Sequence, residues 1–223
     1  MGGTSEFFKT FFEAFGMESP GSSYMWMIVF MGLIGLAIAI ERVYYIMVRS
    51  NVNAPKFMAE IRKLVASGNI RRAIELCEKG KEKALPYVVL GGLKRAVESD
   101  KLDFRAIQNA VDESTLEVIP KLNERTNYLS MMANVATLLG LCGTIYGLIL
   151  AFGAVGSETI PASEKTLYLS RGISAAMMTT IMGLLVAIPL TVIFTVIQNS
   201  TTKIIDEMDE HLVKLINLIT NNK

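Results

Sequence analysis

Long uncharged stretches alternate along the chain with segments in which apolar and charged residues are mixed. Asp, Glu, Lys and Arg are absent from three runs, at 19–40, 126–157 and 172–202. A helix of roughly 20 apolar residues crosses a hydrocarbon core about 30 Å thick, and each run reaches that length. The pattern therefore predicts three transmembrane helices, at 22–46, 128–155 and 168–199.

The segments between and after these runs also have helical patterns. In 47–127 apolar residues recur at spacings of three and four, Pro86 and the Gly91-Gly92 pair interrupt the pattern, and no alternation typical of strands occurs. We expect this insert to be a helical domain that continues into the second span. We also expect a loop at 156–167 and a C-terminal helix at 200–223. The predicted fold class is an all-α membrane protein.

The N-terminal segment, 1–21, has the pattern of an amphipathic helix. Its five phenylalanines share one helical face and are Phe7, Phe8, Phe11, Phe12 and Phe15. Such a helix can lie in the outer membrane interface or pack on the protein itself, and the pattern favours neither. Because the segment holds three Glu and a single Lys, it lacks the basic region of a signal peptide. The first span is therefore expected to be a retained anchor.

Lysine and arginine are distributed unequally around the spans. Three of them lie in 1–23 and 156–171, whereas 18 lie in 48–127 and 201–223. Positive residues accumulate on the cytoplasmic side of membrane proteins. We therefore expect a bacterial inner-membrane protein with its N-terminus outside and with the insert and the C-terminus in the cytoplasm.

Residues suited to enzyme chemistry are scarce. The only histidine, His211, has no partner at metal-binding spacing and is expected to be a solvated helix residue. The chain has no G-x-S-x-G, and GLCGTIYG lacks the lysine of a phosphate-binding loop. Basic residues form no concentrated face for nucleic acid. Cys77 and Cys142 would lie in reducing or apolar surroundings, where we expect no disulfide. We expect neither enzyme activity nor a cofactor.

Small and hydroxylated residues form a stripe on each of the last two spans, at helical spacings of three and four. In the second span the stripe consists of Thr137, Gly140, Thr144, Gly147 and Ala151. In the third span it consists of Ala176, Thr180, Gly183, Ala187 and Thr191. Such stripes permit close helix packing, as in the spacing of Gly143 and Gly147, with threonines bonded to their own helix. Two stripes on consecutive spans also suit a narrow polar passage, and both interpretations stay open.

Three segments carry a resemblance to a known family. LLGLCGTIYGLILAF, SRGISAAMMTTIMGLLVAIPLTVIF and the IERVYYI that ends the first span resemble the ExbB/TolQ branch of the MotA/TolQ/ExbB ion-channel family. The similarity covers essentially the whole chain. It implies a homopentamer whose second and third spans surround the helices of an ExbD- or TolR-like single-span dimer with an intramembrane aspartate. Flow of H⁺ or Na⁺ would drive work on envelope partners, which can include a TonB- or TolA-like protein.

The resemblance assigns residues by motif. Thr144 matches the pore threonine of the second span, Thr180 matches that of the third, and Pro189 matches a proline that can kink the third helix. Two positions depart from the family pattern. The chain has Ala175 where the family usually has glutamate, and Thr179 where alanine commonly precedes the pore threonine. Positions 175 and 179 share a helical face, so a hydroxyl is expected beside the place of the lost carboxylate.

This departure bears on the transported ion. Na⁺ needs several oxygen ligands to replace its hydration, and Thr144, Thr179 and Thr180, with backbone carbonyls and a partner carboxylate, can supply them. The partner's acid can equally carry a proton, so Na⁺ is favoured only slightly. The predicted ion pathway is Thr144, Thr179, Thr180 and Ala175. The predicted packing or kink positions are Gly140, Gly143, Gly147, Gly183 and Pro189.

Two other functions remain open beside the pore-forming subunit of an ion-driven motor. A membrane scaffold that stabilises a partner protein would use the same packing stripes. A subunit of a solute transporter is also considered, although spans without an intramembrane charge offer little with which to hold a polar solute.

Overall fold

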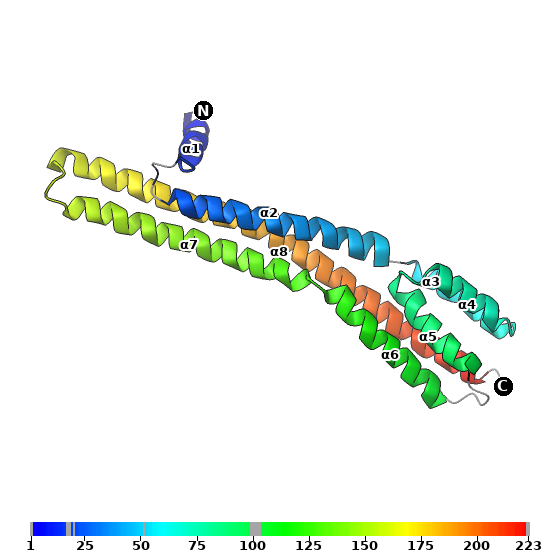
Figure 1. Cartoon of the computed structure of the whole chain (residues 1–223). Helices are drawn as coiled ribbons and strands as arrows, with labels where there is room; N and C mark the ends of the chain where they lie inside the picture. The colour runs from blue at the N-terminus through cyan, green and yellow to red at the C-terminus, as the bar shows by residue number, and fades with distance from the viewer. Residues whose placement is uncertain (1, 17–18, 20, 51, 99–103, 222–223) are drawn as a thin grey trace. The chain divides into compact units, whose positions relative to one another are not determined.

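Every regular element is a helix in the computed structural model, which describes residues 2–16, 19, 21–50, 52–98 and 104–221 (Figure 1). The elements are α1 Gly2–Glu13, α2 Ser22–Tyr44, the π-helix η1 Tyr45–Ser50, α3 Ala54–Ala66, α4 Ile70–Lys79, α5 Ala84–Glu98, α6 Phe104–Asn123, α7 Thr126–Gly156 and α8 Ala162–Asn221. No strand occurs among these residues, which confirms the all-helical prediction for the described chain.

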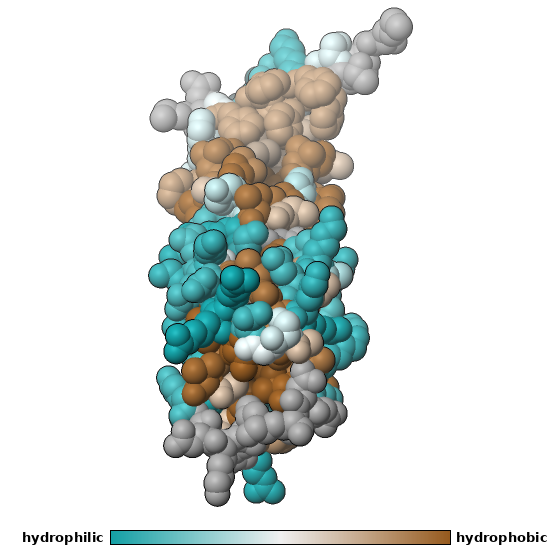
Figure 2. Space-filling view, turned by 90° about the vertical axis from the view of Figure 1, so that its right-hand side faces the viewer, coloured by the Kyte–Doolittle hydropathy of each residue, from teal (hydrophilic) through white to brown (hydrophobic). Residues whose placement is uncertain are grey.

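Three helical stretches are long and apolar enough to cross a membrane, as the sequence predicts. They lie within Ser22–Ala66, Phe104–Gly156 and Ala162–Ile219. The space-filling view shows the same contrast on the surface, since one part of the visible face is almost uniformly apolar and another is largely hydrophilic (Figure 2). The limits of the spans within a bilayer stay predictions.

The chain divides into two compact units. The membrane unit consists of Met1–Ile40 and Asn127–Phe194, and the polar unit consists of Glu41–Thr126 and Thr195–Lys223. Helix α8 contributes to both units, because no glycine or proline interrupts it after Pro189. The separate C-terminal helix predicted at 200–223 is therefore the last part of a single helix.

The predicted loop at 156–167 is shorter than expected. Helix α7 continues to Gly156, and α8 already begins at Ala162. The Pro161 carbonyl accepts the first backbone bonds of α8, from Glu164 at 2.9 Å and Lys165 at 3.3 Å. Glu164 in the first turn suits the positive end of the helix dipole. A proline followed by an early acidic residue is the start signal that the hydropathy pattern did not reveal.

The insert does not continue into the second span without interruption, which corrects a second prediction. Helix α6 ends at Asn123 and α7 starts at Thr126. Between them Arg125 has a φ of +58°, a left-handed conformation that few residues other than glycine adopt. The Arg125 guanidinium contacts both carboxylate oxygens of Glu41, at 3.0 and 3.2 Å, so this ion pair stabilises the break between the helices.

A buried arginine lies at the same junction of the polar unit. The Arg42 side chain is only 3% exposed. Its guanidinium lies 3.4 Å from the Lys121 carbonyl oxygen, 3.8 Å from a Glu124 carboxylate oxygen and 5.2 Å from the centre of the Tyr45 ring. These groups compensate in part for the water that the charged side chain has lost, and among the described residues the Arg42 Nε has no hydrogen-bond partner.

The polar unit has a core of bulky aliphatic residues. In its part of α8, buried side chains recur at spacings of three and four, at Met208, Leu212, Leu215 and Ile219. Asn53 caps the start of helix α3, because its side-chain oxygen accepts a hydrogen bond from the Lys56 N–H at 3.2 Å. It ends at Ala66, and Gly68 beyond it has a φ of +75° that allows the chain to turn toward α4.

In the membrane unit, α1 packs on other helices of the unit. Ala14 of the following turn forms a buried cluster with Met25 and Met178, and Phe11 and Phe15 pack against it. Phe7, Phe8 and Phe12 remain exposed. The helix therefore both packs on the protein, as one of the two open alternatives held, and keeps an apolar edge free.

Candidate functional site

Helices α7 and α8 meet along a seam of very small residues in the membrane unit, where Figure 1 shows them side by side. The buried members of the seam are Gly140, Gly143, Gly147 and Ala151 from α7, and Gly172, Ala176, Thr179 and Gly183 from α8. A Cβ added at Gly183 would lie 2.8 Å from the Ala136 carbonyl oxygen and 3.2 Å from the Gly140 Cα. The two backbones are thus so close that a methyl group has no room.

Glycine occupies positions of the seam at which the neighbouring helix leaves too little room for a side chain. A Cβ at Gly143 would lie 2.7 Å from the Thr179 hydroxyl, and a Cβ at Gly147 would lie 2.9 Å from the Ala176 Cβ. By contrast, nothing lies within 4 Å of a Cβ at Gly153. In lipid, where apolar side chains gain nothing by leaving the solvent, close backbone approach is a main source of helix association.

Three hydroxyls and two carbonyls gather at the middle of this seam and form what we call the oxygen cluster: the hydroxyls of Thr144, Thr179 and Thr180 and the carbonyls of Gly140 and Ala176. The Thr144 hydroxyl is hydrogen-bonded to Thr180 and lies 3.1 Å from both carbonyl oxygens. The Gly140 carbonyl is also within 3.2 Å of the Thr179 hydroxyl and 3.4 Å of the Thr180 hydroxyl. The structure thus brings together all three threonines predicted from the sequence.

The three threonines are not equivalent in accessibility. Thr144 and Thr180 are half-buried at the edge of the seam, whereas Thr179 is only 1% exposed. The Thr179 hydroxyl donates to the Ala176 carbonyl at 2.7 Å and fills the space beside Gly143. The buried Thr179 hydroxyl is thus bonded to backbone carbonyls, and its role in the ion pathway stays a prediction.

Ala175 lies one helical turn before Thr179 and is also buried, with 8% exposure. The two positions therefore share a face, as the sequence indicates, and this face is turned into the protein.

The start of helix α2 is close to the oxygen cluster. Gly21, with a φ of +91°, precedes α2, and a Cβ there would lie 3.3 Å from the Thr179 Cγ2. Further along α2, Gly35 is in contact with Leu190 of α8. The cluster is thus level with the beginning of the first span rather than with its centre, a relation that the sequence does not reveal.

Pro189 lies within α8 without ending it. It lines an apolar groove of about 280 Å³ between α2 and α8, together with Gly32, Val186 and Leu190. As in any helix, proline leaves the carbonyl four residues earlier without its usual partner.

The predicted stripes also contain residues outside the seam. Thr137 is exposed, and its hydroxyl donates to the Ala133 carbonyl of its own helix at 3.1 Å. Thr191 is likewise exposed and bonded to the Ala187 carbonyl at 2.8 Å. Thr137 and Thr191 are thus bonded within their own helices and lie outside the seam.

Acidic and basic residues lie outside the two runs that contain the oxygen cluster. The runs 126–157 and 172–202 contain no acid or base. Glu41 is paired with Arg125 in the polar unit. Among the described residues, no group of three His, Cys, Asp or Glu could hold a metal. His211 differs from its expected role as a solvated residue, since it is half-buried and its Nδ1 lies 3.4 Å from Arg62 Nη2.

The helices and the seam define an α-helical membrane protein with an uncharged, hydroxylated contact between its last two spans. The sequence model of the MotA/TolQ/ExbB proton channel family matches residues 81–210, and the chain belongs to this family. That family comprises ion channels rather than enzymes, and its membership together with the three apolar helices identifies an inner-membrane protein.

Relatives extend the similarity over most of the chain. A putative biopolymer transport protein ExbB homolog of Methanothermobacter thermautotrophicus is 27% identical over 216 residues, which cover 96% of this chain and 71% of the relative. A putative biopolymer transport protein ExbB-like 3 of Synechocystis is 29% identical over 160 residues, covering 70% of this chain and 71% of the relative.

A solved structure shares the fold. The C. jejuni MotAB structure matches with a TM-score of 0.64 at 15% identity, and the match covers 88% of this chain and 77% of that chain. At this identity the likeness concerns the fold alone. It agrees with the helical architecture described above.

Proposed function

We propose that this chain is the pore-forming subunit of an ion-driven motor in the inner membrane, in which flow of H⁺ or Na⁺ does mechanical work on envelope partners. The observation that carries the proposal is the oxygen cluster at the contact of α7 and α8. It gathers three hydroxyls and two carbonyl oxygens in a segment that holds no charged residue. A purely structural contact between helices needs the glycines but does not need three hydroxyls.

In this proposal five copies surround a dimer of a single-span partner that brings an intramembrane aspartate. The motif resemblance and the likeness in fold to a MotAB complex support this assembly. The N-terminus lies outside and the insert and C-terminus lie in the cytoplasm, which the distribution of lysine and arginine supports. The partner supplies a titratable group inside the membrane, which the runs 126–157 and 172–202 of this chain lack.

The threonines have two roles in the proposed pore. Thr144 and Thr180, at the edge of the seam, offer hydroxyls to the ion or to water that accompanies it. Thr179 positions the Gly140 and Ala176 carbonyls through its buried hydroxyl. Neutral oxygens of this kind suit Na⁺, and the proposal favours Na⁺ slightly over H⁺.

The assembly is tested by purifying the tagged chain from its native membrane in mild detergent. Native mass spectrometry should find five copies of the chain with a single-span protein whose helix contains an aspartate. A chain that remains monomeric or dimeric in detergent and in lipid nanodiscs would contradict the motor.

The pore is tested by ion flux through proteoliposomes that contain this complex. Thr144→Val and Thr180→Val preserve volume but remove a hydroxyl, and each should reduce flux about tenfold, since a hydrogen bond or ligand lost in this way is worth about 1 to 1.5 kcal/mol. Thr137→Val is the matched control, because that hydroxyl bonds only within its own helix among the contacts described, and flux should stay within about twofold of the wild type. Normal flux in the Thr144→Val/Thr180→Val double variant would leave packing as the role of these threonines.

The ion is tested in the same proteoliposomes at fixed pH and membrane potential. Flux should rise saturably with Na⁺ and not with choline. Ala175→Glu combined with Thr179→Ala should shift the dependence toward protons, because burial raises the pKa of a carboxyl group. Undiminished flux in Na⁺-free buffer would identify H⁺ as the ion and leave the rest of the proposal standing.

A further inference from the structure

A polar cleft of about 190 Å³ lies in the polar unit, outside the site described above. Its lining comes from the π-helix η1, the turn before α5, α5 itself and the end of α6, and consists of Tyr45, Ser50, Lys81, Glu82, Lys83, Ala84, Tyr87, Val118, Lys121 and Leu122. Three lysines and one glutamate face it, which leaves a surplus of two positive charges. A volume near 190 Å³ equals that of about six water molecules and is enough for a phosphate group.

Two of the three lysines have no acidic partner. The Lys121 ammonium is bonded to Glu117 at 2.6 Å, and Glu82 is paired with Arg49 at 3.6 Å. Among the described residues, no carboxylate forms an ion pair with Lys81 or Lys83. The positive charge of the cleft therefore comes from this adjacent pair, which an anionic ligand would neutralise.

The back wall of the cleft is fixed by a hydrogen-bonded group of three residues. Tyr87 donates to one carboxylate oxygen of Glu117 at 2.6 Å, and Lys121 donates to the other at 2.6 Å. The bond from Lys121 holds the pKa of the Glu117 carboxyl below its usual value, and the same bond raises the pKa of Lys121. All three groups stay in their bonded ionisation states at neutral pH, so the wall keeps its shape.

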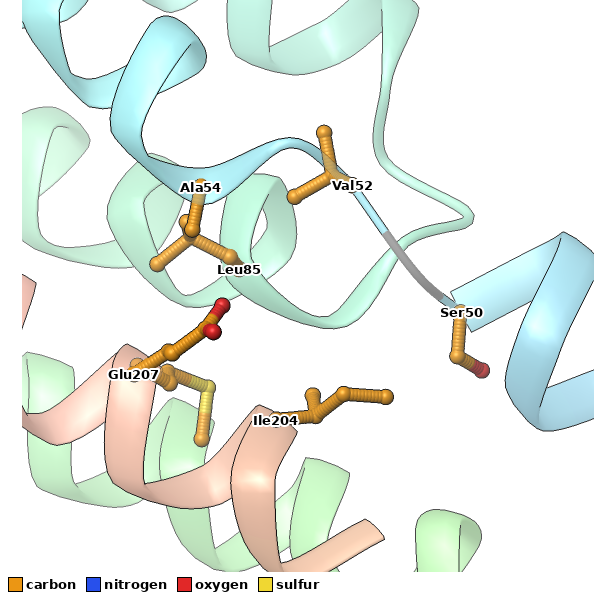
Figure 3. A pocket seen from close by; sticks show the side chains of 7 residues that line it. Ser50, Val52, Ala54, Leu85, Ile204 and Glu207 are labelled. Carbon is orange, nitrogen blue, oxygen red and sulfur yellow. The ribbon is translucent and has the colours of Figure 1, made fainter. Parts of the chain in front are cut away.

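Ser50 adds a polar group from the opposite wall. Its side chain is 3% exposed, and its hydroxyl has no hydrogen-bond partner among the described residues. Ser50 also borders a second cavity of only about 10 Å³, in which the Glu207 carboxylate points toward Leu85 and Ala54 (Figure 3). In that view the Ser50 hydroxyl points away from Glu207.

Two residues of the cleft are close in the sequence to uncharged runs. Tyr45 follows the last residue of the uncharged run, Ile40, by five helical residues, or about 8 Å at 1.5 Å per residue. Lys121 precedes the next uncharged run, which starts at Thr126, by five residues, with the break after α6 between them. The headgroup layer on each side of a bilayer is about 5 to 8 Å thick. Tyrosines are enriched at this depth, and both walls of the cleft carry one.

We propose that this cleft binds the phosphate of an anionic phospholipid headgroup at the membrane surface. Lys81 and Lys83 provide the charge, Ser50 provides a hydroxyl, and the aromatic rings of Tyr45 and Tyr87 flank the glycerol. Binding there would fix the η1 segment and the turn before α5 relative to the lipid surface, independently of the ion pathway.

The test compares lipid adducts of the purified full-length chain by native mass spectrometry, with phosphatidylglycerol and phosphatidylcholine as probes. The wild type should retain phosphatidylglycerol in preference to phosphatidylcholine. Lys81→Gln/Lys83→Gln should weaken retention of phosphatidylglycerol about 30-fold, since each lysine near an anionic surface contributes roughly a factor of five. Lys63→Gln/Lys79→Gln removes the same charge from outside the cleft and should bind like the wild type.

Two further measurements identify the source of the phosphate and check that the variants are folded. Inorganic phosphate at millimolar concentration should not displace the lipid; if it does so with equal affinity, the site is one for a soluble anion and the lipid proposal is overturned. Circular dichroism should show unchanged helix content in both double variants. Equal loss of lipid in both, or no loss in Lys81→Gln/Lys83→Gln, would likewise overturn the proposal.

Discussion

The membrane unit and the polar unit are both helical, yet their helices are held together by opposite kinds of residue. In the polar unit, buried Met208, Leu212 and Leu215 fill the space between helices. In the membrane unit, Gly140 and Gly183 bring two backbones to within van der Waals contact. Burial of large apolar groups is favourable only when the alternative is water. In lipid, close packing and hydrogen bonds hold the helices together instead of apolar burial.

The two units also differ in how they satisfy their charged and polar groups. The polar unit satisfies its charged groups by pairing, as at Glu41 with Arg125 and at Glu117 with Lys121. The membrane unit has no Asp, Glu, Lys or Arg at 127–157 or 172–194, and the hydroxyls there are bonded to backbone carbonyls. Four substitutions test this contrast, and they follow in order of the effect expected.

The largest effect is expected in the aliphatic core. Leu215→Ala removes a side chain that is 1% exposed and should lower the free energy of unfolding by about 2 to 5 kcal/mol. Hydrogen exchange measured by mass spectrometry should accelerate in the polar unit and not in the membrane unit. Val213→Ala, at an exposed position of the same helix, is the control and should change little. Equal acceleration in both units would show that they unfold as one.

The next effect concerns the glycine seam. Gly183→Ala places a methyl group against the Ala136 carbonyl, which belongs to the backbone and cannot rotate away, so we expect destabilisation of about 1 to 3 kcal/mol. The unfolding midpoint in an SDS titration of mixed micelles measures it. Gly153→Ala meets nothing within 4 Å and should leave the midpoint unchanged or slightly higher. If both variants behave alike, the close approach of α7 and α8 is wrong.

A smaller effect is expected from the buried hydroxyl. Thr179→Val removes the donor to the Ala176 carbonyl while preserving volume, and hydrogen bonds between membrane helices contribute about 0.6 kcal/mol and at most about 1.7. The same SDS titration should detect a shift of that size. In the proposed pore Thr179 positions the cluster rather than facing the ion, so Thr179→Val should also reduce ion flux less than Thr144→Val. A greater loss of flux in Thr179→Val would make Thr179 a direct ligand.

The effect that is smallest at neutral pH comes from a buried thiol of the polar unit. Burial raises the pKa of Cys77 from 9.0 to about 12. A raised pKa means that the folded state holds the proton more tightly, so stability is unaffected below pH 9 and falls as the pH rises from 9 toward 12. The loss at pH 10 should be about 1 kcal/mol. Guanidinium unfolding of Cys77→Ala at pH 8 and pH 10 should lack this part of the pH dependence, and its persistence there would assign the effect to other groups.

Much of the membrane unit could be predicted from the sequence. The uncharged runs identify three helices because a bilayer requires internal hydrogen bonding over about 20 residues. The small-residue stripes likewise identify Gly140, Gly147 and Gly183 as positions of contact. The helix limits were less predictable, since Pro161 starts α8 early and Arg125 interrupts α6 and α7 through conformations that hydropathy does not encode.

The sequence by itself determined the number of spans, the residue types of the seam and the family, because periodicity and motif are properties of the chain alone. Only the tertiary structure decided which threonine of the adjacent pair faces inward. Neighbouring residues on a helix point about 100° apart, so Thr179 and Thr180 cannot share an environment. The contact with Gly143 buries the first and leaves the second at the edge beside Thr144. The polar cleft, too, depends on segments that are far apart in the sequence.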